Sequence, residues 1–268
     1  MDPAASERTV RLLGPEAFAR LEAARVLVLG LGGVGSWCAE ALARAGVGAL
    51  DLVDSDVYVP SNLNRQLGAL VSTLGRPKAE VERERVLAVN PDARVRAFVL
   101  RYDAESAPRL PLSLYDAVVD AIDLVSSKLL LLRLAREAGV PVFSAMGGGN
   151  KLDAARFRIS RLSATNRDPL AKAMRKKLRR VGADPRRVVA VASDEEPRAP
   201  FAPEAGTGAR HVPPGTLPHV VGVEGLLLAQ AVLDRLAGPP AAPLACQARD
   251  AALRAARAGA VAGAAGVC

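Results

Sequence analysis

The hydrophobic and polar positions of this chain alternate between two periods. Short apolar or alternating runs, which are typical of strands, cover residues 26–29, 50–53, 94–99, 115–123 and 140–145. Segments with apolar residues at helical spacing separate them, at residues 15–24, 36–45, 77–89 and 128–138. Strands and helices that alternate in this way predict an α/β fold, with a doubly wound, Rossmann-like and mostly parallel sheet.

The second half of the chain continues this pattern. An alternating run at 157–162 and an apolar run at 188–192 indicate strands, and a basic helix over 168–180 lies between them. An apolar helix follows over 219–236. We expect these elements to extend the same sheet within one domain.

The expected domain covers residues 25–237. A helical arm precedes it at 1–24, and an alanine- and glycine-rich tail follows at 238–268. Within the domain, residues 193–218 are rich in Pro, Gly, Ala and charge, which indicates a mobile surface loop. This loop either gates a substrate or is an insertion without a role.

The clearest chemical signal follows the first strand. Four closely spaced glycines come directly after it, at Gly30, Gly32, Gly33 and Gly35. They let the backbone approach a phosphate, while the next helix offers free N–H groups. Asp54 then falls where a ribose hydroxyl is bound, with Asp56 as a second acid nearby. This arrangement alone serves NAD, FAD, S-adenosylmethionine or ATP.

Groups suited to a polyphosphate come next. They are Asn62, Arg65, Gln66, Lys78 and Asp123. A dehydrogenase has no use for this set, because hydride transfer needs no clamp on a triphosphate. Asn62 can also shape a turn after Pro60, and Lys78 can be an ordinary exposed helix residue, so both interpretations stay open for each.

Composition limits the remaining classes. The chain has 268 residues, half of them hydrophobic, which is enough for one large core. Three cysteines without CxxC spacing exclude a disulfide framework and a cysteine zinc site, and we expect Cys38 to pack against the sheet. We also expect a cytoplasmic protein without a membrane span or secretory signal, with loose membrane association of the C-terminal region left open.

The net charge of +8 favours a polyanionic partner. Basic side chains gather on the predicted helix at 168–180, as Lys172, Arg175, Lys176, Arg179 and Arg180. They form either a solvated helix face or a surface that contacts nucleic-acid phosphates.

Five motifs stand in order between residues 11 and 232: GLGGVGS, DLVDSDVYVPSNLNRQ, GRPKAE, DAVVDAID and GTLPHVVGVEGLLLAQAV. Together they resemble the ubiquitin-activating-enzyme-like (ThiF/MoeB-like) adenylating family. With DPLAKAMRKKLRR, they look most like its tRNA-modifying dehydratases, which adenylate the threonyl carboxylate of N6-threonylcarbamoyladenosine beside the anticodon and close a ring with loss of AMP. The resemblance implies ATP, Mg²⁺, a tRNA rather than DNA substrate, and a homodimer, and leaves room for a sulfur-relay protein partner.

The chemistry assigns roles to the site residues. Arg65 and Lys78 meet the phosphates, Asp123 holds Mg²⁺, and Gln66 orients Arg65. By resemblance, Arg11 looks like the arginine that a partner subunit contributes across the dimer, and Arg8 is close enough to compete.

Two other functions stay open. One is an activator of a ubiquitin-like sulfur-carrier protein, which the missing CxxC pairs count against. The other is an NAD-type module, which Arg65, Lys78 and Asp123 together argue against. The run Gly147, Gly148 and Gly149 also allows several interpretations, namely a monovalent cation site, a pyrophosphate site or a flexible crossing.

Overall fold

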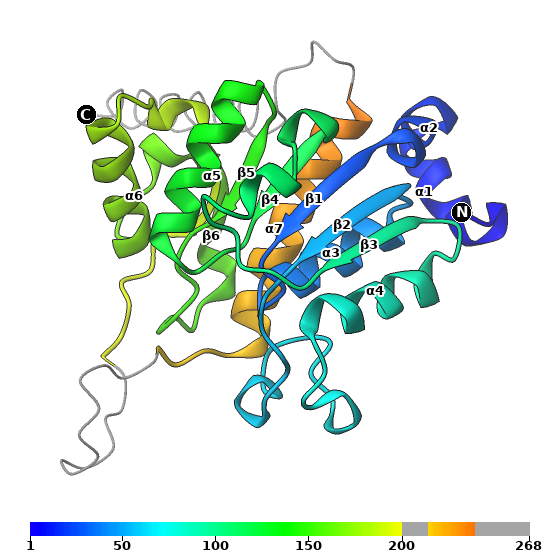
Figure 1. Ribbon diagram of the computed structural model, residues 1–268, viewed down its shortest axis with the longest axis horizontal. Helices are drawn as coiled ribbons and strands as arrows, with labels where there is room; N and C mark the ends of the chain where they lie inside the picture. The colour runs from blue at the N-terminus through cyan, green and yellow to red at the C-terminus, as the bar shows by residue number, and fades with distance from the viewer. Residues whose placement is uncertain (200–213, 239–268) are drawn as a thin grey trace, which may run out of the picture.

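The computed structural model describes residues 1–199 and 214–238 (Figure 1). Its seven-stranded sheet has the order β3-β2-β1-β4-β5-β7-β6, and all neighbours pair in parallel except β6 and β7. The strands are β1 (Arg25–Leu29), β2 (Ala49–Val53), β3 (Arg94–Phe98), β4 (Ala117–Asp120), β5 (Val142–Ala145), β6 (Phe157–Arg161) and β7 (Val189–Ser193). The predicted α/β fold is confirmed, including the extension of one sheet by the later strands.

Helices cover both faces of the sheet (Figure 1). One face packs against α3 (Gly35–Arg44), α4 (Lys78–Val89) and α7 (Pro218–Ala237). The other packs against α5 (Val125–Ala138) and α6 (Pro169–Arg180). Because both faces are covered, the central strands consist mostly of apolar residues, as is typical of parallel sheets.

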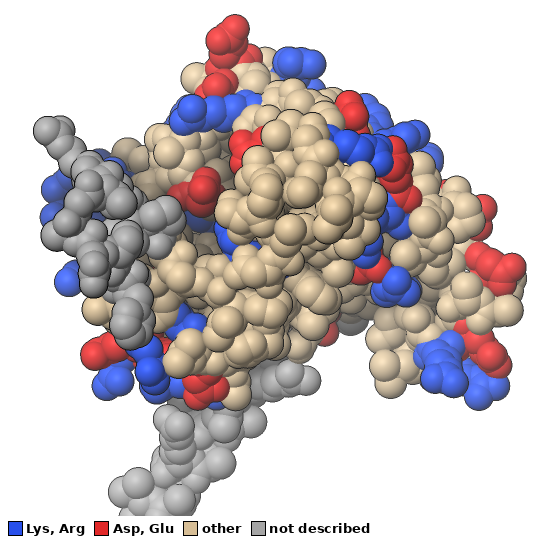
Figure 2. Space-filling view, turned by 90° about the horizontal axis from the view of Figure 1, so that it is seen from below, with Lys and Arg blue, Asp and Glu red and all other residues tan. Residues whose placement is uncertain are grey.

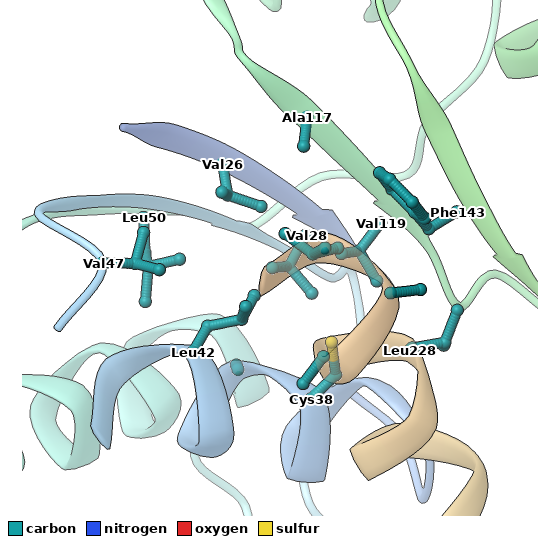
Figure 3. Close-up of a cluster of buried hydrophobic side chains, with 14 of the residues drawn as sticks. Val26, Val28, Cys38, Leu42, Val47, Leu50, Ala117, Val119, Phe143 and Leu228 are labelled. Atoms are coloured by element: carbon teal, nitrogen blue, oxygen red, sulfur yellow. The ribbon is translucent and has the colours of Figure 1, made fainter. Parts of the chain in front are cut away.

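Alternate residues of β1 serve the two sides of the core. Val28 faces α3 and α7, whereas Leu29 faces the α5 and α6 side. Figure 3 shows Cys38 and Leu42 of α3 below Val28. Cys38 is fully buried, as predicted, and burial raises the pKa of its thiol.

The N-terminal arm forms two helices, α1 (Pro3–Leu13) and α2 (Pro15–Ala23). Asp2 caps the first, since its side chain accepts a hydrogen bond of 2.7 Å from the Ala4 amide. The Arg20 side chain of α2 donates to the carbonyl of Ala237 at the end of α7. The arm therefore contacts the helix that closes the described fold.

Parts of the predicted segments lie outside the described residues. These parts are 200–213 of the loop at 193–218 and 239–268 of the tail. Residues 194–199 and 214–217, at the two ends of that loop, contain no helix or strand. In the described ranges, no helix combines the length and apolar character needed to cross a membrane.

Candidate active site

A cavity of about 680 Å³ opens at the carboxyl ends of the parallel strands. It lies where the chain order reverses between β1 and β4, which is where ligands bind in open α/β sheets. Its walls include the predicted residues Gly30, Gly32, Gly33, Asp54, Asp56, Asn62, Arg65, Gln66, Lys78 and Asp123. The fold thus brings together residues that are up to 93 positions apart in the sequence, from Gly30 to Asp123.

The turn after β1 depends on two glycines with different roles. Gly30 has a φ of +86°, and a Cβ there would lie 2.5 Å from the Ala121 carbonyl oxygen. A Cβ on Gly35 would lie 1.8 Å from the Gly30 carbonyl oxygen. Gly35 is buried behind the turn and is not among the residues that line the cavity, so it shapes the turn and does not face the cavity.

Asp54 holds this turn in place. Its Oδ2 accepts a hydrogen bond of 2.7 Å from the Leu31 amide, and its Oδ1 accepts one of 2.8 Å from the Asp56 amide. Burial raises the pKa of the Asp54 carboxyl, and the Lys78 charge opposes that shift. The Asp54 carboxylate therefore holds the backbone of the cavity wall through these two hydrogen bonds, and Asp54 also lines the cavity.

Lys78 is buried at the first residue of α4. Its Nζ lies 3.1 Å from Asp56 Oδ2, and its amide donates to the Asp56 carbonyl over 2.9 Å. The sequence left two interpretations of Lys78 open. Its burial contradicts the one in which Lys78 is an ordinary exposed helix residue. Among the described residues, the Lys78 ammonium pairs with the exposed Asp56 carboxylate alone. Lys78 also lines the cavity.

Arg65 lies across the glycine turn. A Cβ on Gly33 would come within 3.3 Å of Arg65 Cγ, so the glycine makes room for the arginine stem. The guanidinium donates to the Ser61 carbonyl (2.7 Å) and to Asn64 Oδ1 (2.9 Å). Both partners are neutral, so in the described chain this charge is not paired with a carboxylate. Gln66, predicted to orient Arg65, makes no hydrogen bond to it there.

Asn62 and Gln66 are both buried in the wall. Asn62 Oδ1 accepts from the Val59 amide at 3.2 Å, which is the turn-shaping role left open by the sequence. Gln66 Oε1 is buried and has no hydrogen-bond partner among the described residues. Because a buried amide oxygen normally finds a donor, this atom is suited to receive one from a ligand.

Asp123 lies just beyond β4, exposed at the cavity wall. In contrast to Asp120, which is fully buried and pairs with Lys128 at 3.0 Å, Asp123 takes part in no ion pair among the described residues. One free carboxylate at the wall of this cavity fits Mg²⁺, which usually keeps several waters and binds to one or two protein carboxylates. Among the described residues, no group of three or more His, Cys, Asp or Glu side chains could hold a metal ion.

Sequence reasoning missed a group of buried charges at the base of the cavity. Glu224 of α7 is fully buried and lines the cavity, and neither of its carboxylate oxygens has a hydrogen-bond partner in the part of the chain that the structure describes. Burial raises its pKa to about 8, and the nearby Asp168 charge adds to that shift. The signal is an acidic residue within the apolar helix predicted over 219–236.

Asp168 links this base to the glycine run. Its Oδ2 accepts from Lys151 Nζ at 2.8 Å and from the Gly147 amide at 3.1 Å, and its Oδ1 caps α6 through the Ala171 amide. A Cβ on Gly148 would lie 2.6 Å from Glu224 Oε2. The glycine run is therefore held by Asp168 and packs directly on the unpartnered carboxylate.

Comparison with known proteins decides the family. The profile of the ThiF family matches residues 5–254. The chain belongs to the ThiF family. The resemblance inferred from the motifs is thereby confirmed at the family level.

This chain is also similar to individual members of the ThiF family. A tRNA threonylcarbamoyladenosine dehydratase of Bacillus subtilis is 38% identical over 233 residues, which are 84% of this chain and 91% of that protein. Crystal structures of Escherichia coli tRNA N6-threonylcarbamoyladenosine dehydratase, TcdA, with AMP and with ATP match at a TM-score of 0.80 and 32% and 31% identity, covering 88% of this chain and 96% of theirs. A sulfur carrier protein adenylyltransferase of Thermus thermophilus is 40% identical over 135 residues, 50% of this chain and 49% of that protein.

Helix α6 carries the basic residues that the sequence predicted for nucleic-acid contact. Lys172, Lys176, Arg179 and Arg180 are exposed. Arg175 differs, because it is half-buried and donates to the Leu162 carbonyl and to Thr165 Oγ1. Leu170, in the first turn of α6, lines the cavity, so the helix runs from the cavity wall outward.

The predicted trans arginines lie on α1. Arg11 is exposed and pairs with Glu7 at 2.5 Å, and Arg8 is also exposed. Neither lines the cavity of its own chain. The fold therefore does not bring them together with Arg65 and Lys78 within one subunit.

A third surface surrounds the segment between β2 and α4. Figure 2 shows the face seen from below as largely uncharged in its middle, with charged side chains at its margins. Five large apolar side chains of this segment are exposed: Val57, Val59, Leu63, Leu70 and Val71. The same segment carries Arg65, so this apolar surface adjoins the cavity.

Proposed function

We propose that this chain is an ATP-dependent tRNA-modifying enzyme. It adenylates the threonyl carboxylate of N6-threonylcarbamoyladenosine in tRNA and closes the ring with loss of AMP. The observation that carries this proposal is the convergence of Arg65 and Lys78 on a cavity beneath the glycine turn, in a ThiF-family chain whose relatives include named dehydratases of this nucleoside.

The residues support both steps. A carboxylate oxygen of the substrate attacks the α-phosphorus of ATP, and pyrophosphate leaves. The guanidinium of Arg65 and the ammonium of Lys78 stabilise the negative charge that develops on the phosphate oxygens. In the second step the carbamoyl group attacks the activated carbonyl, loses a proton, and AMP leaves, which closes the ring.

The nucleotide is bound by the walls of the cavity. Asp54 receives a ribose hydroxyl, the amides of the turn from Gly30 to Gly33 approach the phosphates, and Gln66 Oε1 gains a donor. Asp123 would hold Mg²⁺, which would neutralise the departing pyrophosphate. The lack of an ion pair to Asp123 among the described residues supports this role.

A monovalent cation would bind beside Gly147, Gly148 and Gly149. The buried carboxylate of Glu224, in contact with Gly148 and without a hydrogen-bond donor, supports this assignment. Glu224→Gln is expected to abolish any increase in thermal stability that K⁺ or Na⁺ gives over a large organic cation. If K⁺ or Na⁺ raised the thermal stability of Glu224→Gln as much as that of the wild type, Glu224 would not be part of the cation site.

The substrate tRNA would contact helix α6 through its exposed Lys and Arg side chains, and the reaction would take place in the cytoplasm. These contacts reach phosphates and supply affinity without sequence information. Nothing in this arrangement calls for DNA. A sulfur-relay protein partner finds no specific support in the described contacts.

The active form would be a homodimer. The exposed apolar segment beside Arg65 supports this assembly, because large apolar patches mark interaction sites. In it, Arg11 or Arg8 of one subunit would reach the cavity of the other. Inactive Arg11→Ala and Lys78→Met proteins should then regain activity when mixed, because one heterodimer site is intact. No recovery on mixing would remove catalysis in trans by Arg11.

Activation of a sulfur-carrier protein uses the same adenylation and remains the alternative. It has less support, because the sulfur-carrier relative aligns with only 50% of this chain. ATP–pyrophosphate exchange separates the two functions. Exchange stimulated by modified tRNA supports the dehydratase, whereas exchange stimulated only by a carrier-protein C-terminus supports the alternative.

The direct test is mass analysis of tRNA nucleosides from a strain that lacks this protein. The cyclic nucleoside should disappear and its open precursor should accumulate. Complementation with the wild-type gene restores the cyclic form, and complementation with Lys78→Met does not. An unchanged level of the cyclic nucleoside would refute the proposed function.

A further inference from the structure

The proposed function assigns the cavity of about 680 Å³ to the nucleotide, and it is therefore named the nucleotide cavity. A second hollow lies beside it. It has a volume of about 370 Å³ and lies between α5 and the segment that follows β3. Its walls are largely apolar: Ala107, Pro108, Leu110, Pro111, Leu112, Leu130 and Leu134. Tyr102 lines this hollow and the nucleotide cavity alike. The two spaces therefore share one wall.

The shared wall contains an unused polar group. Tyr102 is only 4% exposed, and its hydroxyl is buried without a hydrogen-bond partner within residues 1–199 and 214–238. A buried hydroxyl normally has a partner, since leaving it unpaired costs free energy. A ligand in the hollow would bury mostly apolar surface against its walls, and a polar edge of that ligand would meet the Tyr102 hydroxyl.

Two charged side chains of α5, Arg133 and Glu137, line the hollow and form an ion pair. Arg133 lines it and is exposed, with Glu137 at 2.9 Å, and Arg101 lines the nucleotide cavity. Asp103, the acidic residue nearest to Arg101 in the sequence, accepts hydrogen bonds from the Ser106 and Glu105 amides. Arg136 of α5 donates to the Gly182 carbonyl just beyond α6. This hydrogen bond joins the end of α5 to the residues that follow the basic helix α6.

We propose that this hollow binds the base adjacent to the modified adenosine when that adenosine enters the nucleotide cavity. This inference rests on the proposed function. A nucleobase has two apolar faces and a polar edge, which matches the apolar walls and the Tyr102 hydroxyl. Unstacked bases are the parts of RNA loops that proteins bind in this way. The volume is also within the range of ordinary ligand pockets.

A filled hollow provides the test. Ala104 is exposed and lines the hollow, so Ala104→Trp would occupy it from the rim. Ser113→Trp is the matched control, because Ser113 is exposed nearby and does not line the hollow. Tyr102→Phe removes the unused hydroxyl without removing a protein hydrogen bond. ATP binding by each full-length variant reports that the fold is intact.

The RNA ligands are three versions of one tRNA that carries N6-threonylcarbamoyladenosine. One is intact, and the other two lack the base on the 5′ or the 3′ side of the modified adenosine. For the wild type and the Ser113→Trp control, loss of one of these bases should weaken binding about tenfold. For Ala104→Trp, binding of the intact tRNA should already be weakened to that level, and loss of the same base should change nothing further. Tyr102→Phe should show part of the same effect.

The outcomes separate the two proposals. A wild type that binds and converts the intact tRNA but loses no affinity with either abasic version overturns the hollow as a base site and leaves the enzyme function standing. Equal loss of affinity in Ala104→Trp and the wild type on base removal also overturns it. A wild type that neither binds nor converts the intact tRNA overturns both.

Discussion

The Tyr58 hydroxyl donates a hydrogen bond of 2.6 Å to Glu82 Oε1, and both side chains are fully buried. Tyr58 lies in the segment that carries Arg65, and Glu82 lies one turn after Lys78 on α4. Backbone pairing of Tyr58 with Gly75 and Arg76 closes the same segment. The buried pair thus fixes the position of the Arg65 segment relative to the helix that presents Lys78.

Tyr58→Phe is expected to destabilise the protein by about 1–3 kcal/mol, because it leaves a buried carboxylate oxygen without its donor. Urea unfolding measures this change. Tyr102→Phe is the control, since its hydroxyl has no partner to lose. Equal effects of the two substitutions would contradict a specific contribution from the Tyr58 hydrogen bond.

The stability of the protein should depend on pH through Glu82. Burial raises the pKa of its carboxyl from 4.5 to about 7, whereas the hydrogen bond from Tyr58 and the charge of Arg85 lower it. The folded state then binds more protons than the unfolded state between these values. The resulting stabilisation is fully present below pH 4.5 and is lost as the pH rises through about 7.

Glu82→Gln removes this titration and keeps an oxygen that can accept from Tyr58. The free energy of unfolding of the wild type should therefore decrease more between pH 5 and pH 8 than that of the variant, in urea titrations at fixed ionic strength. Parallel pH profiles for the two proteins would assign the dependence to other groups.

Lys78→Met should lower the rate of pyrophosphate exchange about 100-fold or more, because it removes a buried positive charge from the phosphate site. The apolar replacement suits the buried position, so thermal unfolding should change little by comparison. Arg76→Ala is a matched control, since Arg76 is close in sequence but pairs with Glu84 away from the cavity at 2.5 Å. Comparable losses in the two variants would argue against a direct role of Lys78.

The basic helix offers a separate test of RNA binding. Reversing the exposed charges, with Lys176→Glu and Arg179→Glu, should weaken tRNA binding and flatten its dependence on salt, while ATP binding is retained. Arg94→Glu, an exposed charge on the edge strand β3, should have little effect. Arg175 is unsuitable for this test because its half-buried side chain binds Thr165 and Leu162. Unchanged tRNA affinity would remove α6 from the interface.

The sequence predicted the parts of the molecule that local patterns determine. Strand and helix periodicity predicted the order of elements, and the glycine run with Asp54 indicated which strand ends meet. It did not predict Glu224 or the pairs Lys151–Asp168 and Tyr58–Glu82, because these charges become buried only when distant segments pack together. An acidic residue between apolar neighbours, such as Glu224 in α7, has the same sequence pattern whether it faces a cavity or the core.

The glycines of the nucleotide turn illustrate the same limit and lead to a sharp test. From the sequence, Gly32 and Gly35 are equivalent members of one motif. In the structure, a Cβ on Gly35 would lie 1.8 Å from the Gly30 carbonyl oxygen, whereas one on Gly32 would meet only Gln66 Nε2, at 3.8 Å. Gly35→Ala must therefore displace the backbone of the turn.

We expect Gly35→Ala to lose measurable ATP binding and to unfold at a lower temperature, because close packing leaves no room for the added methyl group. Gly32→Ala should fold normally and retain most of its ATP affinity. Calorimetry of both variants with ATP provides the measurement. If Gly35→Ala bound ATP as tightly as Gly32→Ala, the turn would not have the geometry that places Gly30 against Ala121, and the assignment of this loop to the phosphates would fail with it.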